Sequence, residues 1–432
     1  MPVVTPRLAV ALALGAIVIA AGGGWAMVVV DALVLVLVIV DIAMAPAPSA
    51  VTVVRELPGA LTLGGDGEVI WRVRNPGTRR LTVAVADDLA PSLQAGTRRV
   101  RLDLPPKATV AARTPIVPTR RGRFEPDQLV VRTFGPLGLA GRQRKRSLPG
   151  SLRVLPVFRS RREAELRIDR ARILEIGLRS AQGRGGGTDF ENLREYTVDD
   201  ESRRIDWAAT ARADKTIVRT YRAERNQTVL VLLDTGRVMA GRVEGVPRLE
   251  HAMDAALMLT AVATRLGDRA GLVAFDRQVR AVVPPGHTAA QLARVTDAMY
   301  DLEPQLVESD YRGAFAETLA RWRRRALLVV LTELTEEAVP ETLLPALPLL
   351  AGRHLVVVAS VSDPDVVRWA SAVPTEADTA YRKAAAVASL ERRARTAALL
   401  RGMGATVVDA PPGVVAGQLA DVYLQVKATG RL

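Results

Sequence analysis

The sequence predicts an α/β fold with a doubly wound, mainly parallel sheet, preceded by a small antiparallel β-sandwich and two apolar helices. Three observations support this prediction. From residue 229 onward, apolar strand-like runs alternate with helical segments, as in parallel sheets. Between residues 51 and 157, short β-prone runs are separated by turn signals. The first 45 residues hold two nearly unbroken apolar runs. The predicted parts are 1–45, two transmembrane helices; 50–158, a β-sandwich-like module; 159–228, a motif and connecting region; and 229–430, the doubly wound domain.

The composition restricts the chemistry that this chain can perform. Lys and Arg number 59 against 46 Asp and Glu, which gives the 432 residues a net charge of +13. Such an excess is typical of proteins that bind nucleic acid or an anionic membrane surface, and of the cytoplasmic flanks of membrane segments. The chain has no cysteine, so disulfides, thiolate metal sites and cysteine nucleophiles are excluded.

The two apolar runs are Leu8–Ala21 and Ala26–Ala45, and a glycine turn separates them. The second run reaches spanning length, and the pair predicts two transmembrane helices joined as a hairpin. Asp31 and Asp41 lie away from the centre of their run, so we expect both carboxylates to reach the headgroups. Basic residues flank the pair on both sides. This predicts a multi-pass protein of the inner membrane, with the bulk of the chain in the cytoplasm.

The Ala-Pro-Ala-Pro-Ser segment at residues 45–49 predicts a linker between the membrane helices and the β module. A second basic stretch, Arg142–Arg172, is rich in arginine but contains Phe158 as its one aromatic residue. Nucleic-acid surfaces combine basic groups with stacking aromatics, so we interpret this stretch as a solvated face or a surface near anionic headgroups. The runs expected to form strands in the β module are Val51–Val54, Val69–Arg74, Leu81–Val85, Val100–Leu104 and Leu129–Thr133.

The doubly wound domain is predicted to begin with the wholly apolar strand Val229–Leu233. Ligands of such sheets bind beyond the carboxyl ends of the strands, and Asp234, Thr332 and Glu333 lie at that edge. The expected helices are Leu249–Leu266, Ala289–Leu302, Tyr311–Arg324, Val339–Leu350, Glu376–Met403 and Val414–Lys427. The other expected strands are Ala270–Phe275, Val279–Val283, Ala326–Thr332, His354–Ser360 and Ala405–Asp409.

The connecting region contains a long motif, GTDFENLREYTVDDESRRIDWAATAR, which starts at Gly187. Asp200 is suited to cap a helix that ends near Ala211, because its carboxylate can accept from free backbone N–H groups. The stretch Thr216–Glu224 alternates as a half-buried strand does. The glycines before the motif are not followed by the lysine of a phosphate-binding loop, so nucleotide binding is not predicted.

The charges of this motif are nearly balanced in sign, which favours an internal lattice of ion pairs over a ligand site. We expect Ile205 and Trp207 to lie in the core and to draw Asp206 inward. A paired arginine (Arg194, Arg204 or Arg219) would then neutralise that carboxylate.

The motif resembles the bacterial domain of unknown function 58 family, whose C-terminal half is similar to a von Willebrand factor type A domain. The pieces RRGRF (residues 120–124) and FGPLGLAG (residues 134–141) also resemble this family. The resemblance implies a membrane-anchored adaptor that works with a MoxR-type AAA ATPase in assembling or activating a cell-envelope or metabolic complex. The positions that carry the motif are Asp189, Phe190, Arg194, Tyr196, Asp200, Arg204, Asp206, Trp207 and Arg212.

The resemblance also implies a place for a divalent metal, because type A domains hold Mg²⁺ with an Asp-x-Ser-x-Ser turn and two later loops. This chain keeps the aspartate but lacks both hydroxyls of the turn. We therefore expect no bound metal, no cofactor and no catalytic residue, with Mg²⁺ held through water as the alternative. The corresponding positions are Asp234, Gly236, Val238, Ser309, Asp310 and Glu333.

Two alternatives to the adaptor stay open. One is a metal-dependent hydrolase that uses Asp234 and Glu333, and the other is a basic nucleic-acid-binding protein, although no nucleic-acid partner is expected. For the adaptor, the carboxyl edge of the sheet predicts an acidic rim that suits a basic partner. The segments of this rim are Asp234–Val238, Ser309–Tyr311 and Glu333–Glu337, whose charges we expect to contribute little to stability.

Overall fold

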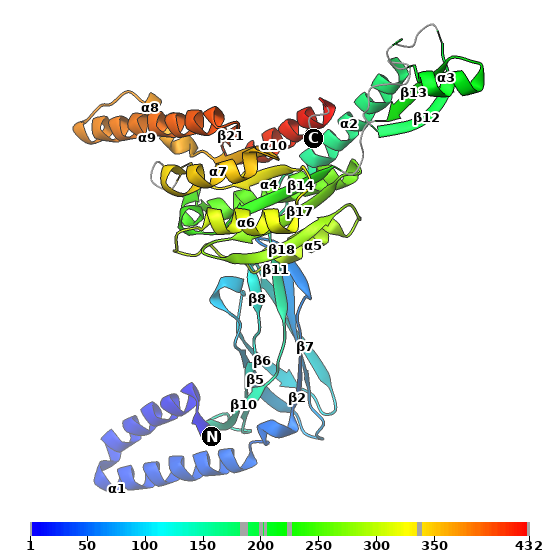
Figure 1. Ribbon diagram of the computed structural model, residues 1–432. Helices are drawn as coiled ribbons and strands as arrows, with labels where there is room; N and C mark the ends of the chain where they lie inside the picture. The colour runs from blue at the N-terminus through cyan, green and yellow to red at the C-terminus, as the bar shows by residue number, and fades with distance from the viewer. Residues whose placement is uncertain are drawn as a thin grey trace. The chain divides into compact units, whose positions relative to one another are not determined.

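The computed structural model describes residues 2–181, 189–197, 202, 205–222, 227–334 and 339–429. It has a mixed α/β architecture with several sheets, one of them a mixed, mainly parallel sheet. The chain divides into two units, Met1–Leu155 and Pro156–Leu432 (Figure 1). Each unit has its own hydrophobic core.

The first unit is a β module with an apolar N-terminal helix. Its sheets have the orders β1-β10-β9-β5-β6, β2-β4-β7 and β3-β11-β8. The elements are β1 (Pro2–Val4), α1 (Pro6–Met44), the short 3₁₀ helices η1 (Pro48–Ala50) and η2 (Pro91–Leu93), β2 (Thr52–Glu56), β3 (Ala60–Thr62), β4 (Gly67–Arg74), β5 (Leu81–Asp87), β6 (Arg99–Leu104), β7 (Thr109–Ile116), β8 (Gly122–Phe124), β9 (Gln128–Phe134), β10 (Ala140–Ser147) and β11 (Leu152–Leu155).

Alternation of side chains builds the core of this module. In β4, Val69, Trp71 and Val73 are buried, while the residues between them face outward. The core also contains a buried ion pair: Arg55 donates to Asp87 at 2.5 Å, and the Trp71 indole N–H donates to the other oxygen of that carboxylate. The five strands predicted for residues 51–133 all form, as β2, β4, β5, β6 and β9. The strongly basic strand β10 was not predicted, because its arginines hide the strand pattern.

The apolar N-terminus forms one continuous helix, α1, where the sequence predicts two. Its two halves lie close together, since a Cβ placed on Gly15 would meet Val30 Cγ1 at 2.7 Å, and Figure 1 shows the helix bent into two arms. Among the described residues, one stretch, Gly24–Ala50, is long and apolar enough to cross a membrane by length and composition. A second apolar helical segment within the described residues is Pro6–Ala20.

Asp41 has a different role from the one that the sequence predicts. Its side chain is fully buried and does not reach outward. Its carboxylate accepts three hydrogen bonds of 2.8 Å, from the backbone N–H groups of Leu137, Leu139 and Ala140. These residues belong to the FGPLGLAG segment, whose Gly135 packs so closely that a Cβ would lie 2.2 Å from Asp41 Oδ1. The FGPLGLAG segment therefore holds the C-terminal end of α1 through these hydrogen bonds.

Further contacts fix this joint. Thr5 donates its hydroxyl to the carbonyl of Gly138, and β1 pairs with β10. The 45–49 segment, predicted as a linker, packs tightly: Pro48 is buried, and the carbonyl of Pro46 accepts from the Thr133 hydroxyl at 2.6 Å. The helix is thus anchored to the β module by buried polar contacts, and residues 45–49 do not form a loose break.

We expect Asp41→Asn to destabilise the first unit by roughly 1–3 kcal/mol, because the amide cannot accept from all three buried N–H groups. The measurement is the thermal unfolding of full-length protein in detergent. Asp31→Asn, an exposed carboxylate on the same helix, is the matched control and should leave the melting temperature unchanged. Equal melting temperatures for the two variants would contradict this role of Asp41.

The second unit is built around a six-stranded sheet of order β18-β17-β14-β19-β20-β21. All its neighbouring pairs are parallel except β17 and β18. The strands are β12 (Asp189–Glu195), β13 (Ile217–Arg222), β14 (Thr228–Asp234), β15 (Arg242–Val243), β16 (Val246–Pro247), β17 (Arg269–Phe275), β18 (Val279–Gly286), β19 (Leu327–Leu331), β20 (Leu355–Val361) and β21 (Thr406–Ala410). The helices are α2 (Arg161–Ala181), α3 (Trp207–Ala213), η4 (Arg237–Ala240), α4 (Arg248–Arg265), α5 (Gln291–Met299), α6 (Tyr311–Arg321), the π-helical turn η5 (Val339–Leu343), α7 (Leu344–Ala351), α8 (Pro364–Ser371), α9 (Ala377–Gly402) and α10 (Val415–Ala428).

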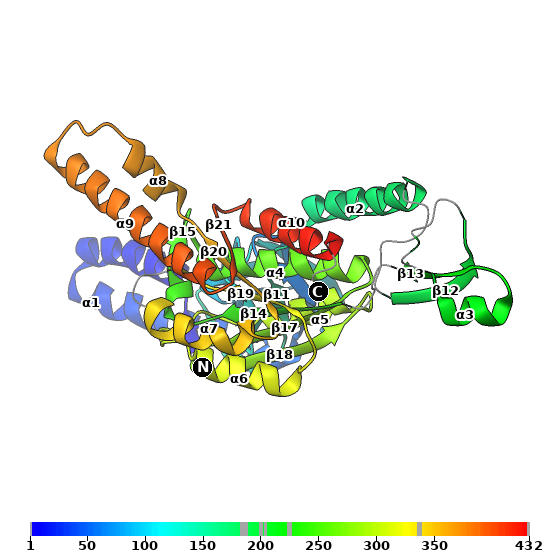
Figure 2. The same cartoon turned by 45° about the horizontal axis from the view of Figure 1, so that its top comes forward.

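Both faces of this sheet are covered by helices (Figure 2). Val229, Val231 and Leu233 of β14 pack with residues of α4, α5 and α10, whereas Leu230 and Leu232 pack with residues of α6, α7 and α9. This two-sided burial explains why every residue of β14 from Val229 to Leu233 is apolar. The predicted order of strands and helices from residue 229 is confirmed, but α2, β12 and α8 were not predicted, because their polar composition hides their periodicity.

Two histidines of this unit are buried, His251 on α4 and His354 beside the start of β20. Burial lowers the pKa of both imidazoles, and for His354 the neighbouring charges of Arg353 and Arg325 lower the pKa further. Neither ring nitrogen of His354 has a hydrogen-bond partner among the described residues. The folded state therefore holds His354 in its neutral form.

These lowered pKa values predict the direction of a pH effect. Between the lowered folded pKa and the unfolded value of about 6.5, the unfolded chain binds more protons, so stability falls as the pH falls through this window. We expect the melting temperature to drop between about pH 7.5 and about pH 5.5, and His354→Phe to drop less than wild type. His287→Gln changes an exposed histidine and should keep the wild-type drop. Equal drops for all three proteins would contradict the prediction.

Candidate functional site

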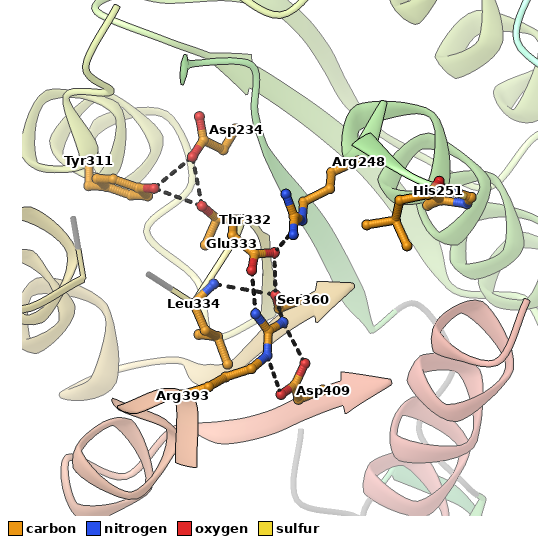
Figure 3. Close-up of polar contacts among 11 residues, drawn as sticks. Asp234, Arg248, His251, Tyr311, Thr332, Glu333, Leu334, Ser360, Arg393 and Asp409 are labelled. Carbon is orange, nitrogen blue, oxygen red and sulfur yellow. Dashed lines mark hydrogen bonds and ion pairs between the residues drawn. The ribbon is translucent and has the colours of Figure 1, made fainter. Parts of the chain in front are cut away.

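The carboxyl edge of the parallel sheet collects the polar residues that the sequence singles out. Asp234 ends β14, Thr332 and Glu333 follow β19, and Ser360 and Asp409 lie near the ends of β20 and β21 (Figure 3). The carboxyl ends of parallel strands meet at one edge, which is why residues so far apart in sequence come together. They form two hydrogen-bonded groups, one centred on Asp234 and the other on Glu333.

The Asp234 carboxylate is fully buried and saturated with donors. Its Oδ1 accepts from Ser309 Oγ at 2.5 Å and from Gly236 N at 2.8 Å. Its Oδ2 accepts from Tyr311 Oη at 2.6 Å and from Thr332 Oγ1 at 2.7 Å. A carboxylate offers about four lone-pair sites, so these four bonds fill its acceptor capacity. Asp234 thereby ties β14 to the loop before α6 and to the end of β19.

The position of Gly236 explains why the turn after β14 lacks a serine. A Cβ on Gly236 would lie 2.1 Å from Ser309 Oγ and 2.9 Å from the carbonyl of Val307. The space that a hydroxyl would need in this turn is occupied by Ser309, which supplies its own hydroxyl from another loop. Val238 lies in η4, and Asp310 uses its carboxylate to cap α6 through Gly313 N.

These residues do not fit an Mg²⁺ site. The ion needs hard oxygen ligands with free lone pairs, and those of Asp234 are taken by three hydroxyls and a backbone N–H. Burial, followed by the charge of Asp234, raises the pKa of Tyr311 well above its usual value, so its hydroxyl stays a donor. Within the described residues, no three His, Asp or Glu side chains are grouped to hold a metal.

Glu333 is the centre of a buried network of ion pairs. Its Oε2 lies 3.0 Å from Arg248 Nε and accepts from Ser360 Oγ at 3.0 Å. Its Oε1 accepts from Arg393, which also donates to both oxygens of Asp409 at 2.6 and 2.7 Å. Two carboxylates thus face two guanidinium groups, and the charges cancel.

The network also fixes the protonation state of its arginine. Burial acts to lower the pKa of Arg393, but the hydrogen bond to Asp409 and the charges of Glu333 and Asp409 raise it above the usual arginine value. Arg393 therefore stays charged and joins α9 to β19 and β21. The expectation that Glu333 belongs to an exposed acidic rim is wrong, because its side chain is only 6% exposed and is paired on both oxygens. Glu336 and Glu337 lie outside the described residues.

A small hollow with about 10 Å³ of space for water lies beside this network, lined in part by Met239, Arg248, Glu333, Val361 and Val415. A single water molecule needs about 10–15 Å³ of such space, so the hollow is too small for a cofactor. It opens where α4 and α10 begin. The hydrogen bonds and ion pairs at the carboxyl edge have a structural role, because they hold the loops of this edge in fixed positions.

The motif of the connecting region folds into a hairpin and a short helix. Asp189, Phe190 and Arg194 lie in β12, which pairs with β13 in antiparallel register, and Tyr196 N donates to Thr216 O at 2.8 Å. Arg194 donates to the carbonyl of Glu195, and Arg212 Nε donates to the carbonyl of Ala208. Asp200 and Arg204 lie outside the described residues.

Two expectations for this motif change. Asp206 is the N-cap of α3 and accepts from the backbone N–H groups of Ala208 and Ala209, so it fills the capping role predicted for Asp200. Trp207, expected in the core, is 70% exposed at the first position of the two-turn helix α3.

The chain has measurable relatives. Over residues 192–375, it matches the family model described as "Protein of unknown function DUF58". Uncharacterized proteins of Mycobacterium bovis and Mycobacterium tuberculosis are 27% identical over 239 residues, which covers 52% of this chain and 74% of each relative. The family match includes Asp234 and Glu333 but ends before Arg393 and Asp409.

Two solved structures are similar to smaller parts of the chain. The ASH/PapD-like domain of human CEP192 is 12% identical and has a TM-score of 0.19, covering 26% of this chain and 89% of that chain. The CARDB domain of the PF1109 protein from Pyrococcus furiosus, in complex with di-metal ions, is 16% identical and has a TM-score of 0.18, covering 24% and 91%. Similarities at these TM-scores support no argument about this chain.

We expect Glu333→Lys to destabilise the second unit by roughly 3–5 kcal/mol, because it places a third cation beside two buried arginines. The measurement is thermal unfolding of the full chain. Glu308→Lys is the matched control, since Glu308 lies at the same edge with its side chain 60% exposed and pairs with Arg237. An unchanged melt for Glu333→Lys would show that the network does not stabilise the fold.

Proposed function

We propose that this protein is a membrane-anchored adaptor that works with a MoxR-type AAA ATPase in assembling or activating a cell-envelope or metabolic complex. In this proposal, α1 crosses the inner membrane twice and the remaining chain lies in the cytoplasm. The second unit acts as a von Willebrand factor type A-like domain, and its loops at the carboxyl edge contact the ATPase. The adaptor itself carries out no chemical step.

One observation favours the adaptor function over the hydrolase function. Asp234 and Glu333, the two acids considered for catalysis, both make hydrogen bonds or ion pairs within the chain. Asp234 accepts four hydrogen bonds, and Glu333 is paired with Arg248 and Arg393. A general base needs a free lone pair directed at substrate or water, within hydrogen-bond reach. Carboxylates that hold loops in place instead support a rigid binding platform.

The membrane anchor is supported by α1. An 18-residue window within Gly24–Ala50 has a mean hydropathy of 2.8, and only 6% of that window is buried, so most of its apolar side chains are exposed. The close approach of Gly15 to Val30 supports two arms that lie side by side. Small residues at such contacts allow membrane helices to pack closely. Asp41 is satisfied inside the β module, which removes the cost of an exposed carboxylate near the bilayer.

The surface proposed for the ATPase differs from the predicted acidic rim. Glu333 is buried and belongs to the scaffold, whereas Glu308 and Asp310 are exposed on the loop before α6. Glu336 and Glu337 follow β19 in the sequence. Exposed acids at the rim of an interface act mainly on the association rate and on its salt dependence.

We expect the triple variant Glu308→Lys, Glu336→Lys and Glu337→Lys to associate with the ATPase more slowly than wild type, by about tenfold, with the fold intact. The measurement is recovery of the ATPase from the native membrane fraction, followed by binding kinetics. The matched control reverses three exposed acids elsewhere: Glu125, Glu165 and Asp169. Equal recovery by wild type and triple variant would exclude this edge as the docking site. Failure of wild type to recover any MoxR-type ATPase would contradict the partner itself.

A further inference from the structure

The loops that precede β19 and β20 carry a strong excess of positive charge. The carboxyl edge of the sheet holds Asp234, Glu333 and Asp409, all hydrogen-bonded inside the fold. At the amino edge, the segments 319–331 and 343–361, which contain the starts of β19 and β20, include no acidic residue, whereas Asp268, before β17, is buried and paired with Lys427. The exposed arginines in these segments, beyond the ends of α6 and α7, are Arg323, Arg324, Arg325 and Arg353.

Strand register places two of these arginines next to each other. Leu327 pairs with Leu355, and Arg325 and Arg353 each precede the paired residue by two positions. Neighbouring strands are about 5 Å apart, so these like charges adjoin at the same edge. Neither guanidinium, nor that of Arg323 or Arg324, has a hydrogen-bond or ion-pair partner among the described residues.

Helix dipoles do not account for these four residues. Basic side chains favour the last turn of a helix, and the chain has such residues in Arg265, Arg321 and Arg401. The dipole effect falls off within that turn. The four arginines follow the helix ends instead, and they stand in contrast to Arg321, which pairs with Glu317 at 2.5 Å.

Trp322 and His354 lie next to these arginines in the sequence. Trp322 lies within the basic segment, half-buried against the core beneath α6 and α7, and so fixes the course of the backbone. His354 follows Arg353, is 5% exposed, and has no partner for either ring nitrogen among the described residues. An anion at this edge would offset the repulsion between Arg325 and Arg353. Arginine forks match phosphate oxygens in planar, two-bond geometry.

We propose that Arg323, Arg324, Arg325 and Arg353 form a docking surface for the anionic phospholipid headgroups of the membrane in which α1 is anchored. This inference rests on the proposed membrane anchoring. A tethered domain meets the headgroups at high effective concentration, so a modest affinity suffices. Each basic residue that reaches an anionic membrane surface raises association about fivefold.

The chemistry favours lipid over nucleic acid. Binding of single strands requires aromatic side chains free to stack on bases, whereas Trp322 packs against the core. The edge also lacks a helix that could enter a groove, because the four arginines lie in two loops. A bilayer, by contrast, presents many phosphates in a plane, which suits arginines spread along a sheet edge.

The test uses the full chain in lipid nanodiscs, either of phosphatidylcholine alone or with phosphatidylserine added. Because the chain has no cysteine, one introduced cysteine carries the fluorescent donor, and the acceptor sits on a lipid headgroup. Gly352→Cys reports on the amino edge, where an added Cβ meets nothing closer than 3.9 Å. Leu306→Cys, at a residue 79% exposed, reports on the carboxyl edge.

The arginines are changed together to glutamine at 323, 324, 325 and 353. A control variant with the same change in net charge carries glutamine in place of four other exposed arginines: Arg162, Arg170, Arg277 and Arg312. We expect energy transfer from position 352 to rise when phosphatidylserine is added, to fall with salt, and to be lost in the first variant but not in the control. Transfer from position 306 should change less.

Several outcomes would overturn the proposal. These are equal transfer from position 352 in neutral and anionic discs, equal loss in both variants, and binding of a short nucleic acid duplex that the first variant abolishes. A lower melting temperature of the first variant alone would show instead that the arginines stabilise the chain itself. Failure of wild type to enter discs at all would contradict the membrane anchor, whereas entry without dependence on anionic lipid would contradict only the headgroup surface.

Discussion

The hydrogen bonds to Asp234 are the interaction on which the second unit depends most. A buried carboxylate without partners would cost several kcal/mol, so the loops that supply its donors cannot move independently. Ser309 and Tyr311 come from the start of α6, and Thr332 comes from the end of β19. The ends of β14 and β19 and the start of α6 are therefore held together by one carboxylate, that of Asp234. Glu333 repeats this arrangement with arginines in place of hydroxyls.

The sequence predicted the sheet well because its strands are covered on both faces. Continuous apolar runs such as Val229–Leu233 identify buried parallel strands without any knowledge of their neighbours. Polar elements were harder to predict. The helix α2 buries Ala164 and Ile168 but exposes Leu166 and Ile173, and the basic strand β10 shows no apolar alternation. The local amino-acid composition does not show which side chains of these elements pack against the core.

The candidate site was predicted in part. Asp234 and Glu333 were identified from their place after strands, Ser309 from the resemblance to type A domains, and Tyr311 as the end of a predicted rim segment, whereas Arg248 and Arg393 were not identified. A tyrosine that opens a helix and an arginine in the middle of a long helix carry no local sign of their partners. Arg393 lies 60 residues from Glu333 in sequence, and the sheet order alone brings them together. The FGPLGLAG segment was noticed, but its role required the position of Asp41.

Buried carboxylates in this chain accept hydrogen bonds from backbone N–H groups and hydroxyl groups and so hold these groups in place. Asp41, Asp87, Asp234 and Glu333 accept hydrogen bonds from internal donors, so their carboxylate groups are not available for contacts with other molecules. Many arginines, in contrast, are exposed to solvent. The loops before β19 and β20 hold four exposed arginines and no acidic residue, so we expect the potential beside these loops to be positive.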